Sequence, residues 1–278
     1  MLLRQRIVQA MPFRLVEFAK WVVFRGNART CVMCGAKVRR FRAQGLGYQV
    51  LEDLKVVGGM YKPDDVCPIC HGSDRDRLVK HYLDTRWLPQ RREAARILHV
   101  APERSLSQYL TGLPDVDYIA GDIEPHLYRH LRSVRYLSLL ELPFEDASID
   151  LVLCNHVLEH VPEDQVAMRE IRRVLAPGGL AILQVPLSLV LDRTREGDGS
   201  ESRQEKIRLY GQEDHVRIYT PDDYVARLTE AGFEVERYRA AEADPDAVRA
   251  LSLNPLEALH ACRAPEASVV RAEAVGSA

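Results

Sequence analysis

A buried strand that ends in polar side chains is indicated by Ile149-Asp150-Leu151-Val152-Leu153-Cys154-Asn155-His156. Similar short apolar runs occur at residues 97–101, 118–120 and 180–185, and stretches with helical periodicity separate them. Runs of this kind are typical of parallel strands that are covered by helices on both faces. The pattern predicts an α/β fold with a doubly wound, mostly parallel sheet.

Two helices and one long loop are predicted beside this sheet. The first helix begins near Pro162-Glu163-Asp164 and ends before Pro177-Gly178-Gly179, because acidic residues favour a helix start and glycine favours its end. The second begins at Thr220-Pro221-Asp222, and a strand follows it from Phe233. The polar residues 192–214 are expected to form a surface loop that could close as a lid.

Composition and charge limit the classes of protein that fit. The chain has 278 residues, of which 46% are hydrophobic and 28% charged, and this excludes collagen-like, wholly disordered and polytopic membrane proteins. The net charge of -2 conceals +10 over residues 1–96 and -12 over residues 97–278. Opposite charges on the two halves suggest two units with different partners.

Residues 1–30 are predicted to be an amphipathic helical segment, divided by Pro12. It could dock on the rest of the protein, or residues 1–25 could make a peripheral contact with a membrane or another anionic partner. No apolar stretch typical of a secretory signal follows Met1. We therefore expect a cytoplasmic protein, with reduced cysteines.

Two C-x-x-C pairs, Cys31/Cys34 and Cys67/Cys70, stand in a glycine-containing region that we assign to residues 31–95. Four thiolates in two such turns favour one tetrahedral zinc ion. The 32 residues between the pairs exceed the usual spacing of about 15–20. His71 could replace one ligand, and two reduced pairs or a redox dithiol are the alternatives. The predicted role is a structural Zn²⁺, because so small a unit has little core of its own.

Ligands of doubly wound sheets bind beyond the carboxyl ends of the strands, so residues directly after each apolar run are the candidates. Ala101-Pro102-Glu103 follows the first run, Asp122 the second, and Asn155-His156 the third. Asp122 lies 19 residues after Glu103. An acidic residue at about this spacing accepts hydrogen bonds from a ribose diol.

The segments 142–152, 155–161 and 173–179 resemble class I S-adenosylmethionine-dependent methyltransferases of the small-molecule type 11 kind. The resemblance covers residues 96–263, and it implies a seven-stranded Rossmann-like sheet. The Ala-, Val- and Glu-rich residues 264–278 are expected to form a flexible tail. The cysteine pairs and Asp214-His215-Val216-Arg217 are similar to a bacterial subgroup with a zinc-ribbon-like front region.

The resemblance implies roles for individual residues. Asp122 matches the ribose-binding acid, and residues 137–141 match the segment along the adenine. Asn155 and His156 match the strand end that faces the methionine part of the cofactor. The full set of candidate cofactor-binding residues is His99, Ala101, Pro102, Glu103, Asp122, Ile123, Ser138, Leu139, Glu141, Asn155 and His156.

Two departures from the family pattern bear on this assignment. Ala101, Pro102 and Glu103 stand where the family has a glycine-rich loop, and His99 stands where an acid is usual. Ser138 occupies the position of the acid that contacts the adenine amino group, so Glu141 supplies this contact or it is lost.

Methyl transfer requires a nucleophile held in line with the sulfonium methyl group. A base near neutrality helps when the nucleophile is a hydroxyl or a protonated amine. His160 and His215 are the candidate catalytic residues, whereas helix capping, core packing or a solvated loop would explain them without chemistry.

Three functions are compatible with these patterns. The preferred one is a methyltransferase acting on an N or O atom of a small-molecule, glycan or peptide acceptor. The second is an RNA methyltransferase whose basic zinc region holds phosphates through Arg39, Arg40 and Arg42. The third is a binding module without catalysis, which the missing glycines would explain.

Overall fold

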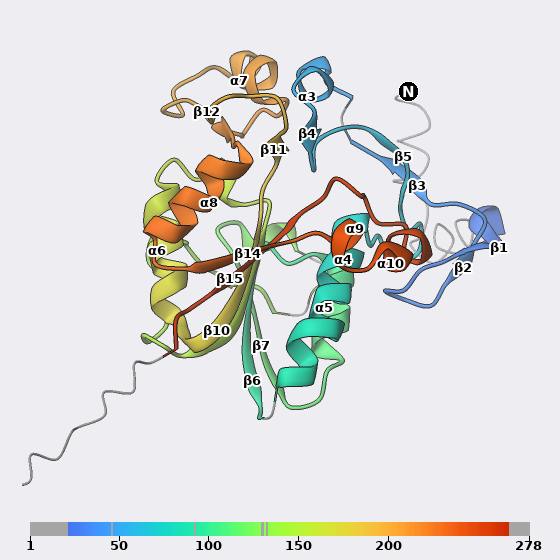
Figure 1. The fold of residues 1–278 in the computed structure, drawn as a ribbon, viewed down its shortest axis with the longest axis horizontal. Helices are drawn as coiled ribbons and strands as arrows, with labels where there is room; N and C mark the ends of the chain where they lie inside the picture. The colour runs from blue at the N-terminus through green and yellow to red at the C-terminus, as the bar shows by residue number, and fades with distance from the viewer. Residues whose placement is uncertain (1–21, 46, 92, 129–130, 132, 267–278) are drawn as a thin grey trace, which may run out of the picture.

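A seven-stranded sheet forms the centre of the computed structural model, which describes residues 22–45, 47–91, 93–128, 131 and 133–266 (Figure 1). The strand order is β14-β15-β10-β9-β6-β7-β8. The strands are β6 (Ala95–Val100), β7 (Val116–Asp122), β8 (Arg135–Tyr136), β9 (Ile149–Asn155), β10 (Leu175–Gln184), β14 (Glu234–Tyr238) and β15 (Leu259–Arg263). β15 is antiparallel to both neighbours, and the pairs among β6 to β10 are parallel. The predicted doubly wound, mostly parallel α/β sheet is confirmed.

Helices cover both faces of this sheet. α4 (Asp74–Tyr82) and α5 (Arg104–Thr111) pack on one face, and α6 (Asp164–Val174) and α8 (Pro221–Glu230) on the other (Figure 1). In β9, Leu151 and Leu153 belong to the first of these cores, and Val152 and Cys154 to the second. Burial on both faces explains why this strand has an almost continuous apolar sequence.

Two small antiparallel pairs precede the sheet. β1 (Arg25–Thr30) pairs with β2 (Lys37–Val38), and β3 (Arg42–Gln44) pairs with β5 (Lys62–Val66). The predicted helix is therefore wrong for residues 25–30, which form β1. At Gly26 an added Cβ would lie 2.7 Å from Arg39 Cβ, so the strand pair depends on a glycine there. Residues 1–21, with most of the predicted amphipathic segment, lie outside the described residues.

A further layer lies beyond the carboxyl ends of β9 and β10. It contains α3 (Gln49–Asp53), β4 (Val56–Val57), β11 (Leu187–Ser188), β12 (Arg195–Glu196), α7 (Arg203–Tyr210) and β13 (Arg217–Ile218). β4 pairs with β11, so the front of the chain is joined to a segment that follows β10.

The prediction that residues 192–214 form a loop is wrong, because β12 and α7 lie within them. Ser202 and Glu205 form a capping box at the start of α7, and Gly211 ends it in the left-handed conformation. Tyr210 of α7 packs with Leu51 of α3 in one apolar cluster. The segment is therefore a packed part of the layer that covers the strand ends.

The described residues that precede β6 are here called the front unit. Arg77 connects the front unit to the end of the chain. Its guanidinium donates hydrogen bonds to the carbonyl oxygens of Leu251 and Ser252 and contacts Asp65 and the ring of Phe41. The helices α9 (Ala240–Ala243) and α10 (Pro245–Ala250) precede these two carbonyls. None of the helices formed by the described residues has the length and apolar character needed to cross a bilayer.

Candidate functional site

The four cysteines of the C-x-x-C pairs form one cluster. Their sulfur atoms all lie within 4.8 Å of one another, with Cys31 Sγ 3.7 Å from Cys70 Sγ and Cys34 Sγ 3.9 Å from Cys67 Sγ. Four thiolates around a zinc ion at about 2.3 Å would lie about 3.8 Å apart. The cluster therefore fits a tetrahedral zinc ion. His71 is exposed and does not belong to the cluster.

The two cysteine turns have the same backbone pattern. Gly35 N donates a hydrogen bond to the carbonyl oxygen of Cys31, and His71 N donates to that of Cys67. Gly35 and His71 both have positive φ values, 71° and 66°. Gly72 N also donates to Cys70 Sγ at 3.4 Å, a contact that stabilises a thiolate. The other two cysteines, Cys154 and Cys262, are buried in the sheet as expected.

A cavity of about 240 Å³, here called the Asp122 cavity, lies beyond the ends of β6 and β7. The apolar side chains of Leu137, Leu139 and Val157 line it together with the carboxylate of Asp122. Asp122 accepts hydrogen bonds from Glu124 N and from the hydroxyl of Tyr128. A carboxylate has about four acceptor sites, so it can also accept bonds from a ligand.

Glu103 is held firmly in the loop after β6. Its carboxylate lies 2.6 Å from His99 Nε2 and 3.2 Å from the amide nitrogen of Asn155. Burial opposes ionisation, but the contacts with His99 and Asn155 outweigh it and keep the pKa of Glu103 below its usual range. Ala101 has a φ of 48°, so this loop takes the left-handed conformation with an alanine.

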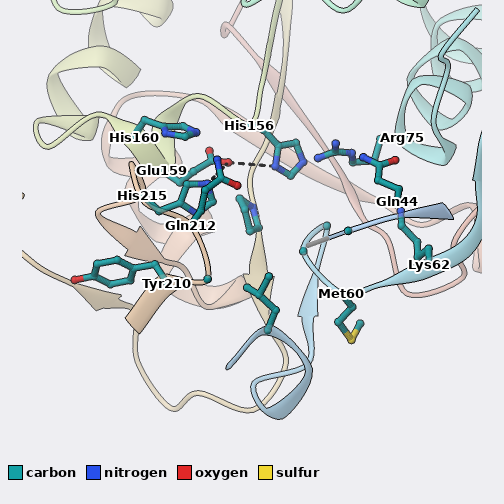
Figure 2. A pocket seen from close by; sticks show the side chains of 16 residues that line it. Gln44, Met60, Lys62, Arg75, His156, Glu159, His160, Tyr210, Gln212 and His215 are labelled. Atoms are coloured by element: carbon teal, nitrogen blue, oxygen red, sulfur yellow. Dashed lines mark hydrogen bonds and ion pairs between the residues drawn. The ribbon is translucent and has the colours of Figure 1, made fainter. Parts of the chain in front are cut away.

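A second cavity of about 360 Å³, here called the Arg75 cavity, lies between the front unit and the ends of β9 and β10 (Figure 2). Gln44, Met60 and Lys62 line it from the front unit, and Arg75 points toward His156 (Figure 2). The guanidinium of Arg75 forms no ion pair with any residue that the structure describes. This side of the cavity therefore offers a positive charge to a ligand.

His156 and Glu159 lie on the opposite wall. His156 has a φ of 55° and donates its backbone N–H to the carbonyl oxygen of Gln184, which fixes it between the ends of β9 and β10. His156 Nδ1 lies 3.2 Å from Glu159 Oε1. Burial, followed by the charge of Arg75, holds the pKa of His156 well below its usual value. Burial raises the pKa of Glu159 to about 8.

His160 lies on the wall that both cavities share. Its ring packs edge-on against that of His215, with 4.6 Å between the centroids, and its Nδ1 lies 3.3 Å from Asp214 Oδ2. Burial lowers the pKa of both imidazoles, to about 3 for His215. Both imidazoles are therefore neutral at pH 7, and burial makes them weaker bases than a free histidine.

The predicted cofactor-binding and catalytic residues fall into four groups. Asp122, Ile123, Ser138 and Leu139 line the Asp122 cavity, and His156, His160 and His215 line the Arg75 cavity. His99, Glu103 and Asn155 form the hydrogen-bonded support between them. Ala101, Pro102 and Glu141 line neither cavity.

Several lining residues of the Arg75 cavity were missed as site residues, namely Gln44, Gly58, Gly59, Met60, Lys62, Arg75, Glu159, Pro186, Tyr210, Gly211 and Gln212. They come from the front unit, from the turn after β9, from the loop after β10, and from the end of α7 with the two residues that follow it. The adjacent glycines Gly58 and Gly59 were the one local signal, because paired glycines often mark close approach of the backbone.

The strand order and the parallel core define a doubly wound, Rossmann-like domain, and the Asp122 cavity lies at the strand ends where such domains bind ligands. Residues 104–183 match the family described as "Methyltransferase domain". This part of the chain is similar to S-adenosylmethionine-dependent methyltransferases, and the sheet around it has the Rossmann-like order described above.

Two curated relatives illustrate the similarity. The 27-O-demethylrifamycin SV methyltransferase of Amycolatopsis mediterranei is 37% identical over 101 residues, which cover 36% of this chain and 35% of the relative. A probable S-adenosylmethionine-dependent methyltransferase of Mycobacterium tuberculosis is 31% identical over 121 residues, which cover 41% and 40%. The chain thus spans two fifths or less of the length of these relatives.

Among solved structures, an S-adenosylmethionine-dependent methyltransferase from Mesorhizobium loti has a TM-score of 0.47 and 16% sequence identity. The similarity covers 69% of this chain and 98% of that one.

Proposed function

We propose that this protein is an S-adenosylmethionine-dependent methyltransferase that methylates an N or O atom of a small-molecule, glycan or peptide acceptor. The observation that carries the proposal is that the Asp122 cavity and the Arg75 cavity share His160 as a wall. A cofactor in the first cavity and an acceptor in the second would meet at this histidine.

The residues of the Asp122 cavity fit the cofactor. The Asp122 carboxylate is placed to accept hydrogen bonds from a ribose diol, and the apolar walls at Leu137 and Leu139 suit an adenine ring. When bound, S-adenosylmethionine supplies the electrophilic methyl group. The Glu103 carboxylate does not line the cavity, and its contacts with His99 and Asn155 would hold the loop after β6 in place beside the cofactor.

The Arg75 cavity would position the acceptor. Arg75 offers a hydrogen-bonding cation to an anionic or polar group. His160, on the wall that both cavities share, is the better placed of the two candidate bases to take the proton that an attacking hydroxyl or ammonium must lose. Methyl transfer then depends mainly on alignment of the two ligands. The Amycolatopsis relative is named as a methyltransferase of an O-demethylated compound, 27-O-demethylrifamycin SV. This similarity supports an oxygen of a small molecule as the acceptor atom.

Calorimetric titration with S-adenosylmethionine tests the cofactor assignment. Asp122→Ala removes the acceptor for the ribose hydroxyls, so we expect the affinity to fall about 10- to 100-fold. Asp117→Ala is the matched control, because Asp117 lies on the same strand and is 67% exposed. A folded wild-type protein that binds no S-adenosylmethionine would refute the proposal and favour a module without catalysis.

We further propose that Cys31, Cys34, Cys67 and Cys70 hold one structural Zn²⁺. The sulfur separations fit the ion, and the cysteine cluster has only a small apolar core around it. Metal analysis of Cys67→Ser is expected to show loss of zinc together with a lower Tm. Cys262→Ser, which changes a buried cysteine of the sheet, should retain zinc.

RNA remains a second candidate acceptor, because Arg39, Arg40 and Arg42 are all exposed on the front unit. If they hold phosphates, RNA binding must weaken steeply as salt rises from about 50 to 200 mM. Substitution of all three by glutamine should reduce both the affinity and the slope. Absence of RNA binding at low salt would leave the small acceptor as the proposal.

A further inference from the structure

Three side chains that can bind metal ions, Glu159, His160 and His215, gather where the two cavities meet (Figure 2). Each offers one ligand atom, and these atoms all lie within 4.8 Å of one another. Glu159 and His160 belong to the short turn after β9, whereas His215 lies just before β13. The fold therefore brings together a set that is distant in sequence and separate from the four cysteines.

The buried carboxyl group of Glu159 has no lysine or arginine partner among the described residues. Its side chain is 1% exposed, and its ion-pair contacts within the described residues are with histidines, His156 at 3.2 Å and His215 at 4.0 Å. The neighbouring Arg217 donates from both terminal nitrogens to backbone carbonyl oxygens, including that of Leu158. Buried carboxylates are normally paired with a cation or bound to a metal ion.

Several buried polar atoms around this point lack a hydrogen-bond partner among the described residues. They include Glu159 Oε2, His215 Nδ1 and His156 Nε2. The side chains of Glu159 and His215 are 1% and 8% exposed. An unpaired buried polar group costs about 1–3 kcal/mol. Glu159 and His215 each carry such an unpaired atom at the wall of the Arg75 cavity, and this favours a bound ligand between them.

We propose that Glu159, His160 and His215 bind one divalent transition-metal ion at the junction of the two cavities. Two imidazoles and one carboxylate favour ions such as Zn²⁺, Co²⁺ or Fe²⁺ over Mg²⁺ and Ca²⁺. Ligands around an ion at about 2.1 Å lie about 3.4 Å apart in a tetrahedron, so these side chains would move together by about 1 Å. Three protein ligands leave a coordination position for a water molecule or an acceptor atom.

His156 would position the carboxylate. Its Nδ1 lies 3.2 Å from Glu159 Oε1, so a proton on this nitrogen would leave the other carboxylate oxygen, Oε2, free for the ion. If the proposed methyl transfer is correct, the ion would replace His160 as the group that promotes loss of the proton, because an oxygen acceptor bound to the ion would lose its proton more easily. Only this consequence rests on the proposed function; the binding of the ion does not.

Titration with Co²⁺ of full-length protein that holds one zinc ion per chain, at the four cysteines, tests the proposal. Calorimetry should show one further ion per chain, and the visible spectrum should have the bands of nitrogen and oxygen ligation without a thiolate-to-cobalt charge-transfer band. His215→Gln and His160→Gln should each weaken this binding at least tenfold. His126→Gln, which changes an exposed histidine of the same domain, is the matched control and should leave it unchanged.

Retained zinc and an unchanged far-ultraviolet circular dichroism spectrum would show that the variants are folded. If either His215→Gln or His160→Gln is unfolded, Co²⁺ binding by the remaining histidine variant and by Glu159→Gln tests the proposal. The inference is overturned if zinc-loaded wild-type protein binds no Co²⁺ at millimolar concentration, or if the folded variants bind it as tightly as wild type. Either outcome leaves the cofactor titration unaffected, so the inference and the proposed function can fail separately.

Discussion

His99 Nε2 lies 2.6 Å from Glu103 Oε2, and this contact joins the end of β6 to the loop that follows it. The other ring nitrogen, Nδ1, lies 2.9 Å from the hydroxyl of Tyr118 on β7. His99 is wholly buried. A histidine in the sheet thus fixes a carboxylate at the strand ends, in a loop that lacks the glycines usual for this family.

Removal of this carboxylate should weaken cofactor binding. Glu103→Ala leaves His99 and the Asn155 amide without their common partner, so we expect a loss of about 1–3 kcal/mol in the free energy of unfolding. We also expect at least tenfold weaker binding of S-adenosylmethionine. Urea unfolding and calorimetry measure the two effects, and Glu124→Ala at an exposed site is the control. Unchanged affinity would show that the loop does not contact the cofactor.

The buried Arg77 should be needed for stability. Arg77→Met removes donors from the carbonyl oxygens of Leu251 and Ser252 and takes a buried partner from Asp65. Loss of one partner of a buried charged network costs about 3–5 kcal/mol. Arg86→Met on the exposed surface should change the free energy of unfolding by less than about 0.5 kcal/mol. Equal effects in the two variants would contradict the role assigned to Arg77.

His260 should contribute to the loss of stability in acid. It is 1% exposed, neither ring nitrogen has a hydrogen-bond partner among the described residues, and the ring of Tyr224 packs against it. Burial, followed by the charge of Arg237, lowers the pKa of His260 to about 3. Because the folded pKa lies below the unfolded one, this contribution is complete above pH 6.5 and is lost as the pH falls toward 3.

His260→Phe should therefore flatten the acid side of the stability curve, by at most about 5 kcal/mol between these limits. Urea unfolding at a series of pH values measures the difference. Release of zinc in acid affects both proteins and cancels in the comparison. His126→Gln should follow the wild-type curve, and a His260→Phe curve parallel to wild type would refute the prediction.

Gly58 should be intolerant of a side chain. It has a φ of 87°, and an added Cβ would lie 2.9 Å from His156 Cε1. Gly47 also has a positive φ, 68°, but nothing lies within 4 Å of its added Cβ. Gly47→Ala therefore measures the backbone strain alone, and Gly58→Ala should cost about 1–3 kcal/mol more in urea unfolding. Equal costs would show that His156 moves aside freely.

The sheet could be read from the sequence because its strands are buried on both faces. The apolar run at 149–154 and its counterparts fixed where β6, β7, β9 and β10 lie, and the polar residues after them marked the ligand end. The cysteine cluster could also be predicted, because two C-x-x-C turns in one short region are typical of a shared zinc site. The prediction failed at residues 25–30 and at residues 192–214, where tertiary packing decides.

By itself the sequence determined the class of fold, the cysteine cluster and the position of Asp122, because each of these depends on local patterns. Only the tertiary structure brought Arg75 from the front unit, His156 from the end of β9 and His215 from beyond α7 to one cavity. Local sequence patterns cannot predict these contacts. They arise because β4 pairs with β11, so that the front unit covers the ends of the strands. The physical reason is that the apolar pattern of each buried strand is local in the sequence. A cavity between two layers is lined by residues that meet only after the layers have packed together.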